Sequence, residues 1–385
     1  MKLLSLLFIL IFLLIACRPG EATIPTLATP NPTPVVSDTP TITPTMPSVT
    51  ATSTHTPLPT AASTSESTPT PIPIAFALPG FIFQGSEPDR PVVSRNPSPA
   101  IRNLYINPGA VLFHDNQFHM FFNSFTGWPS IIKVGYMTSA DGYQWQMAQE
   151  EPVFTTDQVP FGSGFADVSS VVVLDDGTWV IYFHTIQNGQ IGLATAASPF
   201  GPWNVETEPI LMAGSEDTWD EGGLYWPNVI RNGDTYHMYY GGKAGLIKAI
   251  GLATSPDGRH WTKYDDPATS DPPFQESDPV LAASESWESN VVDRPRVQLT
   301  PDGWVMIFAG AAIEERGLAL SEDGIHWAAY TGNPILTPEQ FPIPRAKTWD
   351  TALLFHDNAY YYFMEIGTLD GTDLYLAVHD GPLRQ

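Results

Sequence analysis

One pattern occurs three times in this chain: Ser139-Ala140-Asp141-Gly142-Tyr143-Gln144-Trp145, Ser255-Pro256-Asp257-Gly258-Arg259-His260-Trp261 and Ser321-Glu322-Asp323-Gly324-Ile325-His326-Trp327. A degenerate fourth copy runs from Ser198 to Trp203. The four tryptophans are separated by 58, 58 and 66 residues, and an alternating apolar pattern typical of a β-strand precedes each copy. Such spacing indicates a fold built from repeated units. We expect each Asp-Gly pair to close a hairpin and each tryptophan to pack between neighbouring units.

Five further hairpins accompany these repeats. Apolar runs flank the turns His114-Asp115-Asn116, Asp175-Asp176-Gly177, Asn232-Gly233-Asp234, Pro301-Asp302-Gly303 and His356-Asp357-Asn358. Glycine and asparagine accept the positive φ that tight hairpins need. Five units of about four strands predict an all-β fold, a five-bladed β-propeller of four-stranded antiparallel blades. Strands between Phe76 and Ile101 are expected to supply the edge that closes the ring.

The composition divides the 385 residues unevenly. Before residue 76 the chain has 13 of its 38 prolines and only five charged residues, so almost all of the net charge of −24 belongs to the remainder. Such an acidic surface repels phosphate backbones, which argues against nucleic acid as a partner. The single cysteine excludes a disulfide framework and a thiolate metal cluster.

The N-terminus has the features of an export signal. Lys2 precedes an unbroken apolar run from Leu3 to Ile15, and the sequence Leu14-Ile15-Ala16-Cys17 resembles the bacterial lipobox. The resemblance implies a signal peptide over residues 1–16 and a lipid on Cys17. An ordinary secretory signal with a chance cysteine is the alternative. Residues 17–75 are rich in Thr, Pro and Ser and predict a disordered stalk. Residues 76–385 then form the propeller.

In a propeller the first strand of each blade lines the centre, and the strand starts converge on one face. Aligned through their hairpins, these starts are Asn107-Pro108-Gly109-Ala110-Val111, Asp167-Val168-Ser169-Ser170-Val171, Tyr225-Trp226-Pro227-Asn228-Val229, Asp293-Arg294-Pro295-Arg296-Val297 and Trp349-Asp350-Thr351-Ala352-Leu353. The alignment predicts that three carboxylates, an arginine pair and two tryptophans meet in one pocket.

The blade pattern from about Asn103 to His379 resembles the five-bladed propeller glycosidases, which include arabinanases, xylosidases, invertases, levansucrases and β-mannoside phosphorylases. In the arabinanase-like branch three inner-strand acids act as base, pKa modulator and acid. Asp167 matches the modulator, whereas Asn107 and Tyr225 stand at the base and acid positions. The sequence Asn107-Pro108-Gly109-Ala110 is similar to the opening motif of the mannoside phosphorylases, which implies that Asn107 binds sugar and Asp167 protonates the glycosidic oxygen. The residues around Asp167 lack the Glu-Asp-Pro-Arg pattern typical there, so hydrolysis is expected rather than phosphorolysis.

The candidate catalytic residues are Asp167, Asp293 and Glu221, with Asp350 and Glu365 in reserve. The candidate substrate-binding residues are Asn107, Trp226, Arg294, Asp350 and Trp128, and Trp349 is a further stacking candidate. Structural roles are the alternatives: Asp293 pairing with Arg294 or Arg296, Glu221 as a solvated loop acid, Asp350 capping the last blade, and the tryptophans buried between blades. Glycosidases need one carboxyl with a raised pKa and another that stays ionised.

We therefore predict an extracytoplasmic glycoside hydrolase that uses paired carboxylates on an oligo- or polysaccharide. The alternative is a non-catalytic glycan-binding lipoprotein, and a sialidase-like enzyme is a distant third. We expect a monomer on the bacterial cell surface or the outer face of a membrane, in contact with the membrane only through lipidated Cys17. The sequence indicates no cofactor and no metal-binding motif. A calcium ion in an acidic channel is an open alternative, since no spacing pattern would reveal it. The net charge favours neutral over anionic sugars at the channel mouth.

Overall fold

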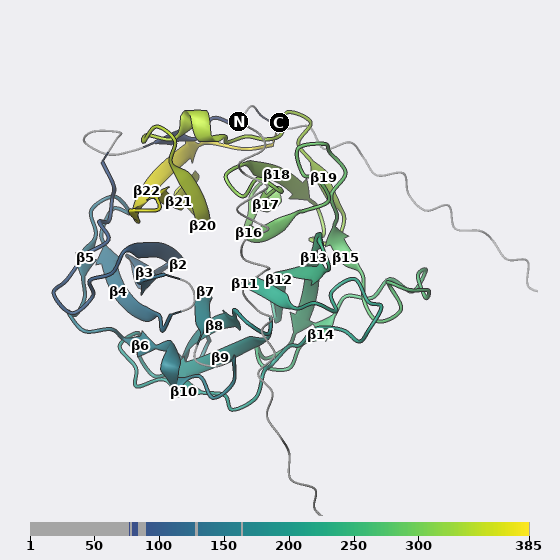
Figure 1. The fold of residues 1–385 in the computed structure, drawn as a ribbon, viewed down its shortest axis with the longest axis horizontal. Helices are drawn as coiled ribbons and strands as arrows, with labels where there is room; N and C mark the ends of the chain where they lie inside the picture. Colours follow the sequence, from purple (N-terminus) through teal and green to yellow (C-terminus); the bar gives the residue numbers. More distant parts are fainter. Residues whose placement is uncertain (1–76, 78, 84–89, 128–129, 163–164, 385) are drawn as a thin grey trace, which may run out of the picture. The chain divides into compact units, whose positions relative to one another are not determined.

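The computed structural model describes residues 77, 79–83, 90–127, 130–162 and 165–384. These residues form five antiparallel sheets that are arranged as the blades of a ring (Figure 1). The predicted all-β, five-bladed propeller with four-stranded blades is confirmed. The signal peptide, Cys17, the stalk and Trp128 lie outside the described residues. Within the described part of the chain, no helix has the length and apolar character needed to span a membrane.

The strands follow the chain from blade to blade. The first blade contains β2 (Tyr105–His114), β3 (Gln117–Phe125), β4 (Lys133–Ser139) and β5 (Gln146–Met147), with β6 (Phe154–Thr155) on β4. The second contains β7 (Ala166–Val173), β8 (Trp179–Thr185), β9 (Ile191–Ala196) and β10 (Asn204–Val205). The third contains β11 (Leu224–Asn232), β12 (Thr235–Ala244), β13 (Ile247–Ser255) and β14 (Thr262–Lys263), with β15 (Pro279–Leu281) on β13.

The last two blades complete the ring. The fourth contains β16 (Asp293–Thr300), β17 (Gly303–Ala309), β18 (Arg316–Ser321) and β19 (Trp327–Ala329). The fifth contains β20 (Lys347–His356), β21 (Ala359–Thr368), β22 (Gly371–Asp380) and β1 (Ile82–Phe83). Two short 3-10 helices, η1 (Thr156–Gln158) and η3 (Pro338–Gln340), lie in the connections.

The ring is closed by pairing between segments from opposite ends of the propeller sequence. In the fifth blade β1 pairs with β22, with Ile82 opposite Val378 and Phe83 opposite Ala377. This pairing covers an edge that β22 would otherwise expose. The expectation that strands before Ile101 close the ring is confirmed.

The repeated pattern forms the turn between the third and fourth strands of a blade. In the first copy the Ser139 hydroxyl oxygen accepts a hydrogen bond from the Gly142 amide at 2.9 Å, and Asp141 Oδ1 accepts one from the Gln144 amide at 2.8 Å. The Trp145 indole nitrogen donates to the Gly142 carbonyl at 3.0 Å. Gly142 has a φ of 76°, which glycine adopts without strain. The Ser, Asp, Gly and Trp that the three copies share therefore each have a local structural function.

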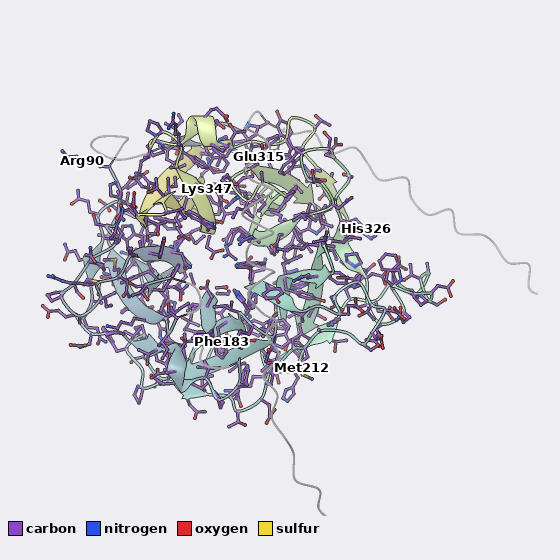
Figure 2. All side chains as sticks on the ribbon, viewed as in Figure 1. Arg90, Phe183, Met212, Glu315, His326 and Lys347 are labelled. Atoms are coloured by element: carbon purple, nitrogen blue, oxygen red, sulfur yellow. The ribbon has the colours of Figure 1, made fainter. Side chains whose placement is uncertain are left out.

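The tryptophans of the pattern pack against the preceding blade, as predicted. Trp261 lies edge-on to Tyr182 at a centroid distance of 6.0 Å, and Trp327 lies edge-on to Tyr239 at 5.7 Å. The buried apolar side chains form five clusters, and each cluster combines two neighbouring blades. Side chains fill these interfaces, where Phe183 is an example (Figure 2). The apolar core of the propeller therefore lies between its blades.

Every innermost strand has an irregularity in its pairing near its start. The register with the second strand shifts between Asn107 and Ala110, Val168 and Ser170, Tyr225 and Asn228, Asp293 and Arg296, and Thr348 and Thr351. Such bulges release backbone groups from the ladder and redirect side chains, and they are common beside active sites. The five bulges mark one end of the ring as the place where polar side chains converge.

Closure of the ring gives a prediction about stability. Phe81 is 9% exposed, and its ring centroid lies 5.9 Å from that of Tyr362 and 5.6 Å from that of His379. Replacing Phe81 with Ala should lower the free energy of unfolding by about 3 kcal/mol, because a buried phenylalanine is lost at the closing strand. Urea denaturation measures the change. Phe200→Ala is the control, since Phe200 is 47% exposed and should cost less than about 1 kcal/mol. Equal losses in both variants would contradict this account of closure.

Candidate active site

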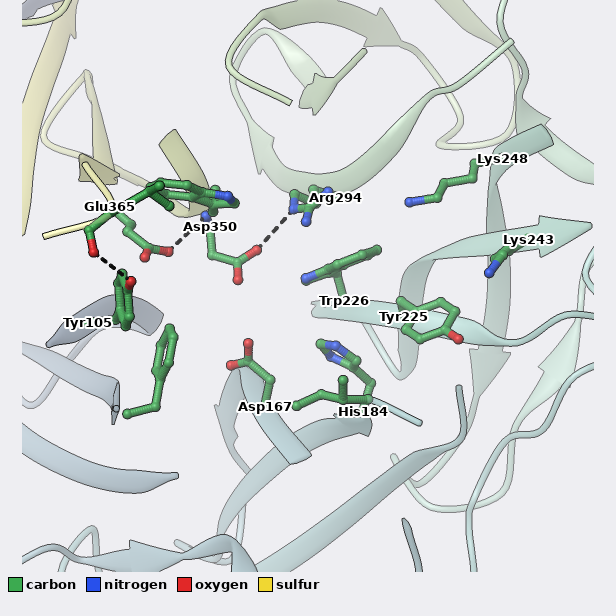
Figure 3. A pocket seen from close by; sticks show the side chains of 14 residues that line it. Tyr105, Asp167, His184, Tyr225, Trp226, Lys243, Lys248, Arg294, Asp350 and Glu365 are labelled. Carbon is green, nitrogen blue, oxygen red and sulfur yellow. Dashed lines mark hydrogen bonds and ion pairs between the residues drawn. The ribbon is translucent and has the colours of Figure 1, made fainter. Parts of the chain in front are cut away.

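A pocket of about 470 Å³ opens at the bulged end of the ring (Figure 3). All five blades contribute to its wall, through Tyr105, Asp167, Trp226, Arg294 and Asp350 in blade order. Its size is in the range of sites for small ligands. Of the groups predicted to converge, two carboxylates, one arginine and both tryptophans line the pocket, whereas Asp293 and Arg296 do not.

Asp167 lies in the pocket wall and is held by two asparagines. Its side chain is almost fully buried, and its Oδ2 accepts a hydrogen bond from Asn107 Nδ2 at 3.3 Å. Its Oδ1 accepts one from Asn123 Nδ2. Asn107 Oδ1 in turn accepts from Asn123 Nδ2 at 2.7 Å and from the Gly109 amide at 3.1 Å. These bonds orient the Asn107 amide so that its nitrogen faces the carboxyl.

Asp350 shares the same amide donor. Its Oδ2 accepts from Asn107 Nδ2 at 3.4 Å, and its Oδ1 accepts from Arg294 Nε at 3.2 Å. One nitrogen of the first blade thus contacts the carboxyls of the second and the fifth blades. Arg294 forms an ion pair with Asp350, whereas Asp167 has no ion pair with a cation among the described residues. The two acids therefore have different environments although they are close to each other.

The electrostatics follow from this asymmetry. Burial, and then the neighbouring charge of Asp350, raise the pKa of Asp167 well above its ordinary value, while Arg296, Asn107 and Arg294 act in the opposite direction. Burial and Asp350 also raise the pKa of Glu365 well above its ordinary value. Glu365 lines the pocket, and its Oε2 accepts a hydrogen bond from the Asp350 amide at 3.3 Å. The site therefore contains carboxyls that favour the protonated form beside one paired with arginine.

Cations form another part of the wall. The Arg294 guanidinium lies 3.9 Å from the centre of the Trp226 ring, and Lys248 Nζ lies 5.2 Å from it. Trp226 and Arg294 have φ values of 51° and 52° within their bulges, a strained conformation for side chains of this size. Trp226 therefore contacts a guanidinium on one ring face, where a stacked sugar was expected.

Asp293 lies behind these cations. It is 1% exposed, and its Oδ2 contacts Lys248 Nζ at 2.6 Å and Arg294 Nη1 at 3.5 Å. It is not among the side chains that line the pocket. This placement matches the alternative in which Asp293 pairs with an arginine, and it gives Asp293 a positioning role.

Glu221 is also placed away from the pocket lining. It is exposed, and its Oε2 accepts a hydrogen bond from the Asp217 amide at 2.8 Å within its own loop. Its neighbour Asp220 is the buried member of the pair and contacts Lys263 Nζ at 2.6 Å. The structure thus brings together Asn107, Asp167, Trp226, Arg294 and Asp350, but places Asp293 behind the wall and Glu221 outside it.

Sequence reasoning missed the side chains that come from the second strands. His184 stands opposite Asp167 in the register, and Asn123 stands opposite Asn107. Burial, with help from Arg294 and Arg296, lowers the pKa of His184 to about 3, so its imidazole is neutral. The predicted hairpins imply these cross-strand partners, and counting back from each turn could have found them.

No three His, Cys, Asp or Glu side chains in the described ranges are grouped so as to hold a metal ion. No protein-family model matches the chain. The uncharacterized protein Rv1502 of Mycobacterium tuberculosis is 28% identical over 145 residues, which are 36% of this chain and 42% of that protein. The matching protein MT1551 of the same species has the same identity and coverage. The match thus spans about two fifths of the length of these relatives.

Solved structures with a similar fold cover most of the chain. One is described under the GH130 family of mannoside phosphorylases, a family that contains glycoside hydrolases that target β-1,2 mannosidic linkages in Candida mannan. It has a TM-score of 0.58 and 17% identity, and covers 80% of this chain and 97% of that one. A glycosyl hydrolase from Bacteroides ovatus has a TM-score of 0.57 and 18% identity, and the match covers 79% of this chain and 94% of that one. A thermostable family-43 glycoside hydrolase has a TM-score of 0.52 and 16% identity, and the match covers 76% of this chain and 97% of that one. The chain thus has the fold of the five-bladed glycosidase propellers.

The raised pKa of Asp167 predicts how stability depends on pH. A carboxyl whose pKa is raised in the folded state stabilises the fold most below its unfolded pKa of about 3.9, and this contribution is lost as the pH rises through the raised value. The stability of the wild type relative to Asp167→Asn should therefore fall as the pH rises from 4.5 to 8, by up to about 1.4 kcal/mol per pH unit. Urea denaturation at each pH measures this difference. Asp176→Asn, at an exposed turn of the same blade, should follow the wild type. A difference that does not change with pH contradicts the raised pKa.

Proposed function

We propose that this protein is a glycoside hydrolase with its active site in the pocket of the propeller. The main observation in support is the arrangement of Asp167 and Asp350, which share the Asn107 amide nitrogen as a donor. Asp167 is buried and has no cation paired with it in the described part of the chain, and Asp350 is paired with Arg294. Two carboxyls in contrasting environments are what acid–base cleavage of a glycosidic bond requires.

Asp167 is the general acid in this mechanism, and Asp350 is the carboxylate partner. Asp167 donates its proton to the glycosidic oxygen while the bond from that oxygen to the anomeric carbon breaks. A water molecule forms the new bond to the anomeric carbon, and Asp350 accepts the proton that the water loses. Asn107 orients both carboxyls, and Glu365 holds the Asp350 backbone through its amide. Trp349, which also lines the pocket, offers an aromatic surface for the sugar.

The comparisons support the same class of reaction. The similar solved structures include enzymes described as glycoside hydrolases, and one of the families contains phosphorylases. Hydrolysis is proposed over phosphorolysis because the residues next to Asp167 lack the Glu-Asp-Pro-Arg pattern. An oligo- or polysaccharide is the proposed substrate.

A glycan-binding protein without catalysis is the second candidate. It is favoured by the ion pair between Arg294 and Asp350, because the arginine occupies an oxygen of the carboxylate that would act as the base. The two candidates differ in whether any bond is cleaved.

The catalytic role of Asp167 can be tested with nitrophenyl glycosides and with arabinan, xylan, mannan and fructan. Asp167→Asn should lower kcat by about 10²- to 10⁴-fold, since the amide cannot donate the proton to the leaving oxygen. Asp176→Asn carries the same substitution at the far end of the same hairpin and should keep full activity. Turnover that survives in Asp167→Asn would defeat the assignment. Binding of a glycan array without cleavage by the wild type would favour the second candidate.

We infer from the sequence that the protein is a lipoprotein exposed outside the cytoplasm. The lipobox-like residues before Cys17 and the Thr/Pro-rich stretch behind it support this location. The wild type should sediment with membranes and be released by detergent, whereas Cys17→Ser should remain in the supernatant after ultracentrifugation. Immunoblots of the two fractions make the measurement. Membrane sedimentation of Cys17→Ser would show that no lipid on Cys17 is needed.

A further inference from the structure

Two lysines of the pocket face each other across one hairpin. Lys243 on β12 and Lys248 on β13 are directly opposed in the register, and both line the pocket. Like charges directly opposite each other destabilise a sheet. In Figure 3 both ammonium groups lie on the third-blade side, across the pocket from Tyr105 and Glu365. An anion between them would offset this repulsion.

The cations of this wall have unused hydrogen-bonding capacity. Arg294 Nη1 is buried and makes no hydrogen bond in the described part of the chain, although it lies 3.5 Å from Asp293 Oδ2. Lys243, a half-buried residue, has no ion pair among the described residues. Lys248 is paired with Asp293 at 2.6 Å. Lys243 is therefore the cation of this wall that pairs with no carboxylate in the described ranges.

The side of the pocket formed by the third and fourth blades is lined by cations, in contrast to the acidic protein as a whole. Lys243, Lys248 and Arg294 carry three positive charges at the pocket, and the nearby carboxylates Asp293 and Asp350 pair with two of them. The chain as a whole has a net charge of −24. A positive wall on such an acidic protein selects anions at this position in spite of the overall repulsion. The overall charge alone had favoured neutral sugars.

We propose that Lys243, Lys248 and Arg294 form a subsite for a carboxylate group on the sugar, so that the substrate is a glycan containing uronic acid. This inference rests on the proposed glycosidase function and names its substrate class. A carboxylate can accept hydrogen bonds from the ammonium groups of Lys243 and Lys248 and from Nη2 of Arg294, because Arg294 Nε donates to Asp350 and Nη1 faces Asp293. Trp226, stacked under the guanidinium, holds it in place, and Asp293 positions Lys248 and Arg294 from behind.

Binding of matched sugars by the full chain tests the proposal. The methyl glycosides of glucuronic, galacturonic and mannuronic acid are compared with those of glucose, galactose and mannose, by calorimetry at low salt. At least one acidic sugar should bind about tenfold more tightly than its neutral partner. The preference should shrink to less than about threefold in Lys243→Met and in Lys243→Gln, which remove one charge and keep most of the side-chain length. Both variants should fold, since they relieve the repulsion with Lys248.

The control variant removes a cation that does not line this pocket. Arg231→Gln removes one positive charge from the other end of β11, where Arg231 pairs with exposed Asp175, and it should keep the preference. Equal or absent binding of all acidic sugars, or a preference that survives in Lys243→Met, overturns the proposal. So does cleavage of neutral glycosides that depends on inorganic phosphate, because the cations would then serve a free anion. Asp167→Asn should retain the acidic preference while losing turnover, so that failure of the subsite and failure of catalysis are distinguished.

Discussion

The break in strand pairing at the start of every innermost strand is the constraint on which the site depends. A regular ladder would direct these side chains alternately up and down the sheet and leave the centre of the ring without a pocket. The bulges instead place residues of all five blades around one opening, including Trp226 and Arg294 in left-handed backbone conformations. The blade interfaces supply the stability that such strained positions need, because each apolar cluster joins two neighbouring blades.

Within the opening, Asn107 determines how charge is distributed. Its amide nitrogen contacts both Asp167 and Asp350, so the two carboxyls are too close to ionise together without a cost. Arg294 pairs with Asp350, while burial and the neighbouring charge of Asp350 raise the pKa of Asp167. Asp293 then holds Arg294 from behind. This polar network gives the two carboxyls different environments, and the cations of the third and fourth blades lie beside them.

Much of the fold was predictable because it depends on local and periodic signals. The spacing of Trp145, Trp261 and Trp327 indicated the repeat, and the turn chemistry at Asp115 and Asn116 located the hairpins. The inner-strand alignment correctly brought together Asn107, Asp167 and Asp350. Glu221 was predicted to reach the pocket but does not line it, because a periodic sequence pattern does not encode the geometry of a loop. Asp293 was aligned correctly, but its burial behind two cations depends on contacts between blades.

The sequence by itself determined the number of blades, the closing strand and the set of residues at the strand starts, since strand periodicity and turn residues act over short distances. Only the tertiary structure decided which carboxyl has an arginine and which has none, and that Lys243 and Lys248 face the same pocket. These properties arise from distances between blades far apart in the chain. Burial and neighbouring charge, which set the pKa of Asp167, exist only once the ring is closed.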